Sequence, residues 1–310
     1  MKTICILTSC FNELGNIRIL HQRFATVFKK FPQYQFKLLI IDNNSTDGTR
    51  DEIERICQVD KRVQAIFNSR NFGHIRSPHH GFREAEGDAI FTIVSDLQVA
   101  PEIIEDFIPK WEAGADIVIG VRADNHADTF ILRIFRTIYY CLVNNLSDIP
   151  LRKNFIGIGL YDKKVATALK QINDPYPYFR GMVFEVGYKI AEVTYKQEAR
   201  VRGITKNNFL TLYDLAMLGI CSHSKIPLRI ATLTGFGAAF LSFLMGMFYL
   251  IYKLIYWDNF RMGIAPVIIG LFFLGSMQLI FLGIIGEYLG FVFTKVQNRP
   301  LVFEEKRINF

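Results

Sequence analysis

The sequence predicts an α/β fold with a mostly parallel sheet, followed by two transmembrane helices. Over the first 120 residues, short β-branched runs alternate with helical patterns, which is typical of a sheet covered by helices. Two long apolar stretches then lie near the C-terminal end of the 310-residue chain, and half of all residues are hydrophobic. The mean hydropathy of +0.19 is high for a purely soluble protein.

The N-terminal elements follow one another in a regular order. A predicted strand at residues 3–8 leads through the polar pair Asn12-Glu13 into a helix over 16–31. The pattern then repeats. The further predicted elements are a strand at 36–41, a turn at 42–47, a helix at 49–57 and strands at 63–67, 89–94 and 117–121.

The two apolar stretches, residues 230–252 and 262–286, carry no formal charge. Their 23 and 25 residues are each long enough to cross a hydrocarbon core of about 30 Å as a helix. More Lys and Arg flank the outer ends than the connecting loop, so we expect both termini to be cytoplasmic. The apolar run at residues 4–7 is too short for a signal peptide. We therefore expect a cytoplasmic domain at 1–227, a two-helix transmembrane domain at 228–290 and a cytoplasmic tail at 291–310.

Two amphipathic segments, residues 130–147 and 208–222, lie between the predicted sheet and the first span. The first is apolar and aromatic, with Arg133 and Arg136 about one turn apart. This composition suits a helix on a membrane surface. A core-packing helix with two solvated arginines explains the segment as well, and both interpretations stay open.

Composition excludes several classes of protein. The net charge of +7 comes without a basic tail, so the sequence does not predict nucleic-acid binding. Five scattered cysteines exclude a disulfide scaffold and indicate reduced thiols. There is neither a GxGxxG nor a P-loop motif. His79 and His80 are adjacent, so they cannot share a helix face as zinc ligands, and we expect them on a helix surface.

Polar clusters follow four of the predicted strands. In parallel sheets the carboxyl ends of strands meet at one edge, where ligands bind. One such cluster alone is more simply a turn, but four on one edge predict a site. They are Asn12-Glu13, residues 42–47, residues 70–73 and residues 96–98.

These clusters, in this order, resemble those of the membrane-bound polyprenyl-phosphate glycosyltransferases, family 2 enzymes of GT-A fold. The resemblance extends over nearly the whole chain and continues past the second apolar stretch. It rests on SCFNE (9–13), IDNNSTDGT (41–49), RNFGH (70–74), SDLQ (95–98) with Pro101-Glu102, GVR (120–122), FRG (179–181), RVRGITK (200–206) and IGEYLG (285–290).

The resemblance implies a role for each matching residue. It places the nucleotide against Ser9, Phe11, Glu13, Asp42, Asn44 and Arg70. It assigns the catalytic roles to Asp96, Gln98, Arg122, Arg200 and Lys206. Asp96 and Gln98 would also face a divalent metal, Mg or Mn. Carboxylate and amide oxygens suit such an ion, and guanidinium and ammonium groups suit phosphates.

This chain departs from the family pattern at two places. The usual Asp-Ala-Asp-Leu-Gln-Asp is here Val94 to Val99, which keeps only the acid Asp96, so we expect weak metal binding. The acid often proposed as base falls on Gly157. A polyprenyl phosphate, with a second pKa near ~6, is already mostly dianionic at neutral pH and needs no such base. Glu185 is the nearest replacement acid, although a helix-face role explains it more simply.

The resemblance implies an enzyme that transfers one sugar, with inversion, from a nucleotide-sugar, expected to be UDP-linked, to a polyprenyl phosphate, expected to be undecaprenyl phosphate. It implies a multi-pass inner-membrane protein with a cytoplasmic catalytic domain, and a homo-oligomer, for which we expect a tetramer. A processive polysaccharide synthase is disfavoured because the chain has too few spans and no QxxRW motif. A catalytically silent nucleotide-sugar-binding membrane subunit stays open.

Overall fold

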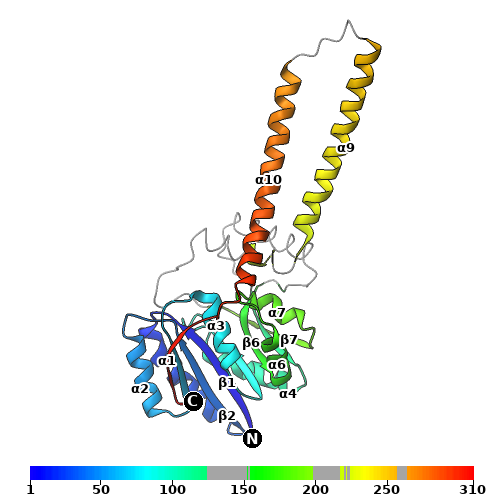
Figure 1. The fold of residues 1–310 in the computed structure, drawn as a ribbon. Coiled ribbons are helices and arrows are strands. Elements are labelled where there is room, and N and C mark those ends of the chain that lie inside the picture. Colours follow the sequence, from blue (N-terminus) through cyan, green and yellow to red (C-terminus); the bar gives the residue numbers. More distant parts are fainter. Residues whose placement is uncertain (124–151, 153, 198–216, 220, 222–223, 257–263) are drawn as a thin grey trace.

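An eight-stranded sheet forms the centre of the N-terminal domain in the computed structural model (Figure 1). The structure describes residues 1–123, 152, 154–197, 217–219, 221, 224–256 and 264–310. The strands are β1 (Lys2–Cys10), β2 (Tyr34–Asp42), β3 (Val63–Asn68), β4 (Ala89–Thr92), β5 (Ile117–Arg122), β6 (Phe155–Asp162), β7 (Ile190–Tyr195) and β8 (Glu304–Ile308). The described helices are α1 (Leu14–Lys30), α2 (Thr49–Val59), α3 (Gly73–Glu84), α4 (Ile104–Glu112), α6 (Lys163–Gln171), α7 (Phe179–Glu185), α9 (Ile226–Ile255) and α10 (Ile264–Val296), with a 3-10 turn at Pro101–Ile103.

The strand order is β7-β5-β6-β4-β1-β2-β3-β8. Pairs β4–β1, β1–β2 and β2–β3 are parallel, with β1 at their centre, as are β5 and β7. β6 lies antiparallel to both β4 and β5, and β8 lies antiparallel to β3. The parallel arrangement brings the ends of β1, β2, β3 and β4 to one edge, as the sequence predicted. Each strand predicted from the sequence corresponds to an observed strand, with bounds that differ by no more than two residues.

Helices cover both faces of the sheet, as its apolar strands require. One core joins the sheet to α1, α2 and α4 through residues such as Phe24, Ile53 and Phe107. The other joins it to α3, α6 and α7 through residues such as Phe82 and Leu169. These two cores hold the strand ends, and therefore the polar clusters, in fixed positions.

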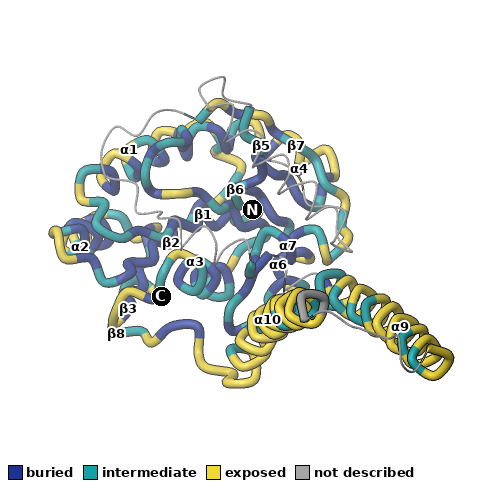
Figure 2. Tube along the Cα trace, turned by 90° about the horizontal axis from the view of Figure 1, so that it is seen from above, coloured by how far each residue is buried: buried dark blue, intermediate teal, exposed yellow. Residues whose placement is uncertain are grey.

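The helices α9 and α10 project away from the layered domain as two long rods (Figure 1). Both are long and apolar enough to cross a membrane. Figure 2 shows their surfaces as mostly exposed, and the Phe236 and Phe272 side chains are among the large apolar groups that no part of the domain covers. They are candidate membrane spans and contain nearly all of the two predicted stretches.

The chain returns to the sheet after α10. Residues 304–308 form β8, which pairs with β3 at the edge of the sheet. This strand was not predicted from the sequence, from which residues 291–310 were expected to form a cytoplasmic tail. Both amphipathic segments, 130–147 and 208–222, fall wholly or largely outside the described residues.

Candidate functional site

The turns after β1 and β2 form one unit at the carboxyl edge of the sheet. The Asn12 backbone N–H donates to Ser45 Oγ at 2.9 Å, and the Asn12 side chain accepts from the Thr46 N–H at 2.8 Å. Asn12 and Asn44 both have a positive φ, a conformation that Asn tolerates better than most residues. The two predicted clusters therefore lie side by side.

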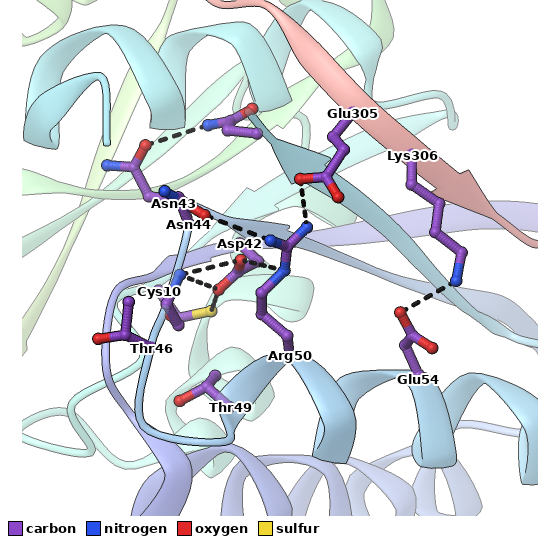
Figure 3. A network of polar contacts seen from close by, with 12 residues as sticks. Cys10, Asp42, Asn43, Asn44, Thr46, Thr49, Arg50, Glu54, Glu305 and Lys306 are labelled. Carbon is purple, nitrogen blue, oxygen red and sulfur yellow. Dashed lines mark hydrogen bonds and ion pairs between the residues drawn. The ribbon is translucent and has the colours of Figure 1, made fainter. Parts of the chain in front are cut away.

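Asp42 is the most buried carboxylate of this edge, with its side chain 1% exposed. The Ser45 backbone N–H lies 3.3 and 3.2 Å from its two oxygens, and Arg50 Nε lies 3.5 Å from Oδ2. Burial raises the pKa of the Asp42 carboxyl, while the Ser45 hydrogen bonds and the Arg50 guanidinium oppose that rise. Figure 3 shows Asp42 between Cys10 and Arg50. Asp42, the carboxylate predicted to bind the nucleotide, is thus held by Ser45 in the turn after β2 and by Arg50 on α2.

Buried Asn43, next to Asp42, organises the turn after β3. Its side chain donates to Asn71 Oδ1 at 2.8 Å and accepts from the Phe72 N–H at 2.9 Å. The exposed Arg70 guanidinium lies 4.1 Å from the centre of the Phe72 ring. The predicted Arg70 therefore stands on an ordered turn beside the Asp42 turn.

The remaining predicted nucleotide residues follow β1. Ser9 Oγ lies 3.3 Å from Ser77 Oγ on α3. Phe11 is half-buried. The Glu13 N–H donates to Thr49 Oγ1 at 2.9 Å, and its carboxylate accepts from Asn16 at 2.6 Å. Glu13 therefore also supports the start of α1.

The residues predicted to face the diphosphate are joined into a chain of hydrogen bonds. Asp96 accepts from the Gln98 backbone N–H at 3.2 Å, and Gln98 Oε1 accepts from Gln197 Nε2 at 2.5 Å. Arg122 Nη1 in turn donates to Gln197 Oε1 at 2.9 Å. Leu97 has a φ of 57°, a strained conformation for a bulky residue that is often found at functional sites. Gln197, which sequence reasoning missed, links the ends of three separate segments.

Few described side chains at this edge of the sheet could bind a divalent metal. Within the described part of the chain, no three His, Cys, Asp or Glu residues are grouped so that they could hold an ion. Val94 and Val99 stand where the family has acids, and Val99 is buried. Asp96, half-buried at a turn, and Gln98 still offer oxygen ligands of the type that Mg²⁺ or Mn²⁺ prefers. The chemistry of these two donors suits a divalent ion, of which they supply only part of the ligands.

A largely apolar cavity lies close in sequence to this chain of hydrogen bonds, because Val94 on its wall is two residues before Asp96. Ser9 and Val94 line the cavity from the ends of β1 and β4, and Gly157 lines it from β6. Gly157 has a φ of 102° and nothing within 4 Å of a Cβ added there. Where the family has the acid often proposed as base, this chain therefore has a glycine with open space around it at the wall of the cavity.

His79 also lines this cavity and is only 2% exposed. The prediction that it lies on a helix surface was wrong, because α3 turns this residue inward with Ser77 and Phe82. Neither ring nitrogen has a hydrogen-bond partner, and burial lowers the pKa of His79 to about 4. At neutral pH the cavity therefore contains an uncharged imidazole.

Two arginines give this region a positive potential. Arg180, in the FRG motif, is half-buried and lines the cavity. Burial raises the pKa of the Tyr195 hydroxyl to about 12, whereas Arg122 and Arg180 both act to lower it. Both guanidinium groups therefore influence one side chain at the end of β7, and such groups bind phosphates.

Residues 5–186 match the family model described as glycosyl transferase family 2. The chain belongs to glycosyltransferase family 2. The SfII prophage-derived bactoprenol glucosyl transferase of Shigella flexneri is 32% identical over 297 residues, which cover 96% of each chain. An uncharacterized glycosyltransferase of Synechocystis is 32% identical over 298 residues, covering 96% of this chain and 93% of that one. The predicted resemblance to the polyprenyl-phosphate glycosyltransferases is confirmed.

Among solved structures, glucosyl-3-phosphoglycerate synthase from Mycobacterium tuberculosis, in complex with Mn²⁺, UDP and phosphoglyceric acid, aligns with a TM-score of 0.47. The two chains are 15% identical, and the alignment covers 71% of this chain and 76% of that one. The family match and the observed layers of sheet and helix confirm the predicted GT-A fold of this glycosyltransferase.

Two predicted phosphate ligands of the glycosyltransferase, Arg200 and Lys206, lie outside the described residues. Three residues that the structure brings to the site were not predicted: Arg50, Arg180 and Gln197. The FRG motif contained a signal for Arg180. Arg50 directly follows the predicted nucleotide cluster, and for Gln197 the sequence offered no signal.

Proposed function

We propose that this glycosyltransferase transfers one sugar from a UDP-linked donor to a polyprenyl phosphate, with undecaprenyl phosphate as the acceptor. One observation carries the proposal: an apolar cavity has both Arg180 and Val94 at its wall, and Val94 stands two residues before Asp96. A polyprenyl phosphate needs both an apolar surface for its tail and cations for its head. The Shigella relative is named a bactoprenol glucosyl transferase, which supports the same acceptor class.

The donor base would lie at the turns after β1, β2 and β3. Asp42 can accept the imide N–H of uracil once the base enters, because a carboxylate is an acceptor only. Phe11 would provide an apolar contact, and Arg70 stands beside the Asp42 turn. Ser9, Glu13 and Asn44 would line the same pocket. The UDP donor is supported by this chemistry and by the family.

The reaction we propose needs no protein base. An oxygen of the dianionic lipid phosphate attacks the anomeric carbon, the bond from that carbon to the β-phosphate oxygen breaks, and UDP leaves on the opposite face. In-line attack inverts the anomeric carbon. The open space at Gly157 is compatible with this, and Glu185 is exposed at the end of α7. Arg122 and Arg180, with Arg200 and Lys206, would neutralise the phosphate charges that develop.

Asp96 and Gln98, together with the donor diphosphate, would hold the divalent ion. When bound, such an ion neutralises the charge of the leaving diphosphate. Because Asp96 supplies the motif's one carboxylate, we propose that the ion binds weakly before the donor arrives.

We also propose that α9 and α10 cross the inner membrane, with the layered domain on the cytoplasmic side. The Lys and Arg residues that flank the outer ends support this orientation. A tetramer stays a prediction from the resemblance.

The test uses the full chain purified in detergent, with Mg²⁺ or Mn²⁺, undecaprenyl phosphate and a panel of labelled UDP-sugars. Transfer yields a labelled lipid that partitions into organic solvent, and the panel identifies the sugar. A silent subunit would bind a UDP-sugar without forming this lipid. Absence of product with every donor and lipid would overturn the proposal.

A further inference from the structure

Arg50 lies in the first turn of α2, where the helix dipole disfavours a positive charge. It is the second residue of α2, and the N-terminus of a helix carries a partial positive charge that favours anions. Asp51 and Glu52, its neighbours in the same turn, follow that rule. A residue that breaks a local rule indicates a role set by its tertiary partners.

The Arg50 guanidinium is surrounded by three oxygen atoms, two from the end of β2 and the turn after it and one from β8 (Figure 3). Its Nε lies 3.5 Å from Asp42 Oδ2, its Nη1 donates to Asn44 Oδ1 at 3.2 Å, and its Nη2 donates to Glu305 Oε2 at 2.8 Å. The centre of the guanidinium lies 5.2 Å from the Phe67 ring centre. The guanidinium therefore has partners for each nitrogen and for its face.

Glu305 reaches this position from the far end of the chain. It lies on β8, the strand that follows α10 and pairs with β3. The next residue of β8, Lys306, forms a separate ion pair with Glu54 of α2, with 3.0 Å between Nζ and Oε1. Farther along, the Asn309 side chain donates to the backbone carbonyls of Cys57 and Val63. The strand is therefore docked by several contacts besides Glu305.

The two acidic partners of Arg50, Glu305 and Asp42, differ strongly in their exposure to solvent. The Glu305 side chain is 53% exposed, whereas that of Asp42 is 1% exposed. A half-exposed ion pair contributes little to folding stability. The pair can nevertheless decide which way a long arginine side chain points, and a buried carboxylate depends strongly on a nearby cation.

We infer that Glu305 is a positioning residue for the donor site, which holds Arg50 against Asp42 and so keeps that carboxylate ready for the nucleobase. The segment after the second apolar helix thereby completes the nucleotide pocket. This inference rests on the proposed UDP donor. Without Glu305, Arg50 loses its shortest ion pair and turns toward solvent more readily, which weakens the counter-charge beside Asp42.

The experiment measures UDP binding, donor KM and kcat for the purified full chain and three variants. Glu305→Gln removes the charge that holds Arg50. Glu54→Gln is the matched control, because it breaks the neighbouring ion pair between α2 and β8 without touching Arg50. The double variant Arg50→Gln/Glu305→Gln, compared with Arg50→Gln alone, tests whether Glu305 acts through Arg50.

For Glu305→Gln we expect UDP affinity to fall and donor KM to rise, each by about three- to tenfold. kcat and the thermal unfolding midpoint should be unchanged. Glu54→Gln should bind UDP like wild type, and Glu305→Gln should add nothing to Arg50→Gln. Wild-type affinity in Glu305→Gln, an equal loss in Glu54→Gln, or a further loss in the double variant would each overturn the inference. If wild type itself binds no UDP, the proposed donor fails, and the inference falls with it.

Discussion

The Gln98 side-chain carbonyl accepts a hydrogen bond from the Gln197 amide at 2.5 Å, although 99 positions separate the two residues. Gln197 follows β7, and its own carbonyl accepts from Arg122 at the end of β5. An amide side chain can donate through its nitrogen to one residue and accept through its oxygen from another. Gln197 therefore links the turn proposed to face the metal with Arg122, the cation proposed to bind phosphate.

Gln197→Leu should lower the transfer rate about three- to tenfold, because Gln98 and Arg122 each lose a hydrogen-bond partner. The exposed neighbour Lys196 provides the control, since Lys196→Ala leaves both contacts in place. Initial rates at saturating donor and acceptor measure the effect. Equal rates for Gln197→Leu and Lys196→Ala would show that the link has no role in transfer.

Asp96→Ala should reduce transfer to less than a tenth of the wild-type rate, a barrier increase above ~1.4 kcal/mol. The reason is that the motif retains no second acid that could replace this carboxylate. Asp106→Ala, which removes an exposed carboxylate from α4, controls for a general loss of charge. A rate for Asp96→Ala above that limit, in folded protein, would contradict the assignment.

Arg180→Gln should raise the KM for the lipid acceptor by tenfold or more, as expected when a charge-assisted contact to phosphate is lost, worth about 1.5–3 kcal/mol. Donor KM should change much less, because the donor base is proposed to bind at the turns around Asp42. Arg55→Gln, on the exposed face of α2, serves as the comparison. A rise confined to donor KM would place Arg180 on the other substrate.

The lowered pKa of His79 predicts how the stability of the folded chain depends on pH. Its pKa is lowered to about 4 in the folded chain, against about 6.5 when unfolded. Between these values the unfolded state binds more protons, so stability is complete above pH 6.5 and falls as the pH drops toward 4, by at most about 3 kcal/mol. Thermal unfolding from pH 7 to pH 4.5 should show a smaller loss for His79→Leu than for wild type. Identical losses would contradict this role.

The membrane orientation can be tested by labelling intact cells with an impermeant thiol reagent. In a background without native cysteines, a Cys at Asn259, between the two apolar helices, should react from outside. A Cys at Val59, which is 87% exposed on the layered domain, should react only after the cells are opened. The reverse pattern would place the donor site outside the cytoplasm.

The layers of the fold were predictable because their signals are local. A β-branched run such as residues 3–8 and the polar turn at 42–47 indicate strand and turn without reference to distant residues. β8 was not predictable in this way. Its sequence, EEKRI, is highly charged, and it pairs with β3 at a sheet edge, where charged residues are common.

The site was predictable wherever its residues follow strands. Asp42 and Asp96 were placed correctly at one edge because parallel strands bring their carboxyl ends together. Glu305 and Gln197 act through contacts across 255 and 99 positions, and no local pattern encodes such pairs. His79 was misplaced because adjacent histidines do not reveal which of them the helix turns inward.

In the reaction that we propose, the sugar alone moves to the lipid phosphate. The most direct test is ³¹P NMR and mass spectrometry of the lipid formed from undecaprenyl phosphate and the UDP-sugar that gives extractable product. We predict a lipid with a single phosphorus, converted from a monoester to a diester and heavier by one sugar residue. A lipid with two phosphorus atoms would mean that a sugar phosphate was transferred, and would contradict the proposed attack on the anomeric carbon.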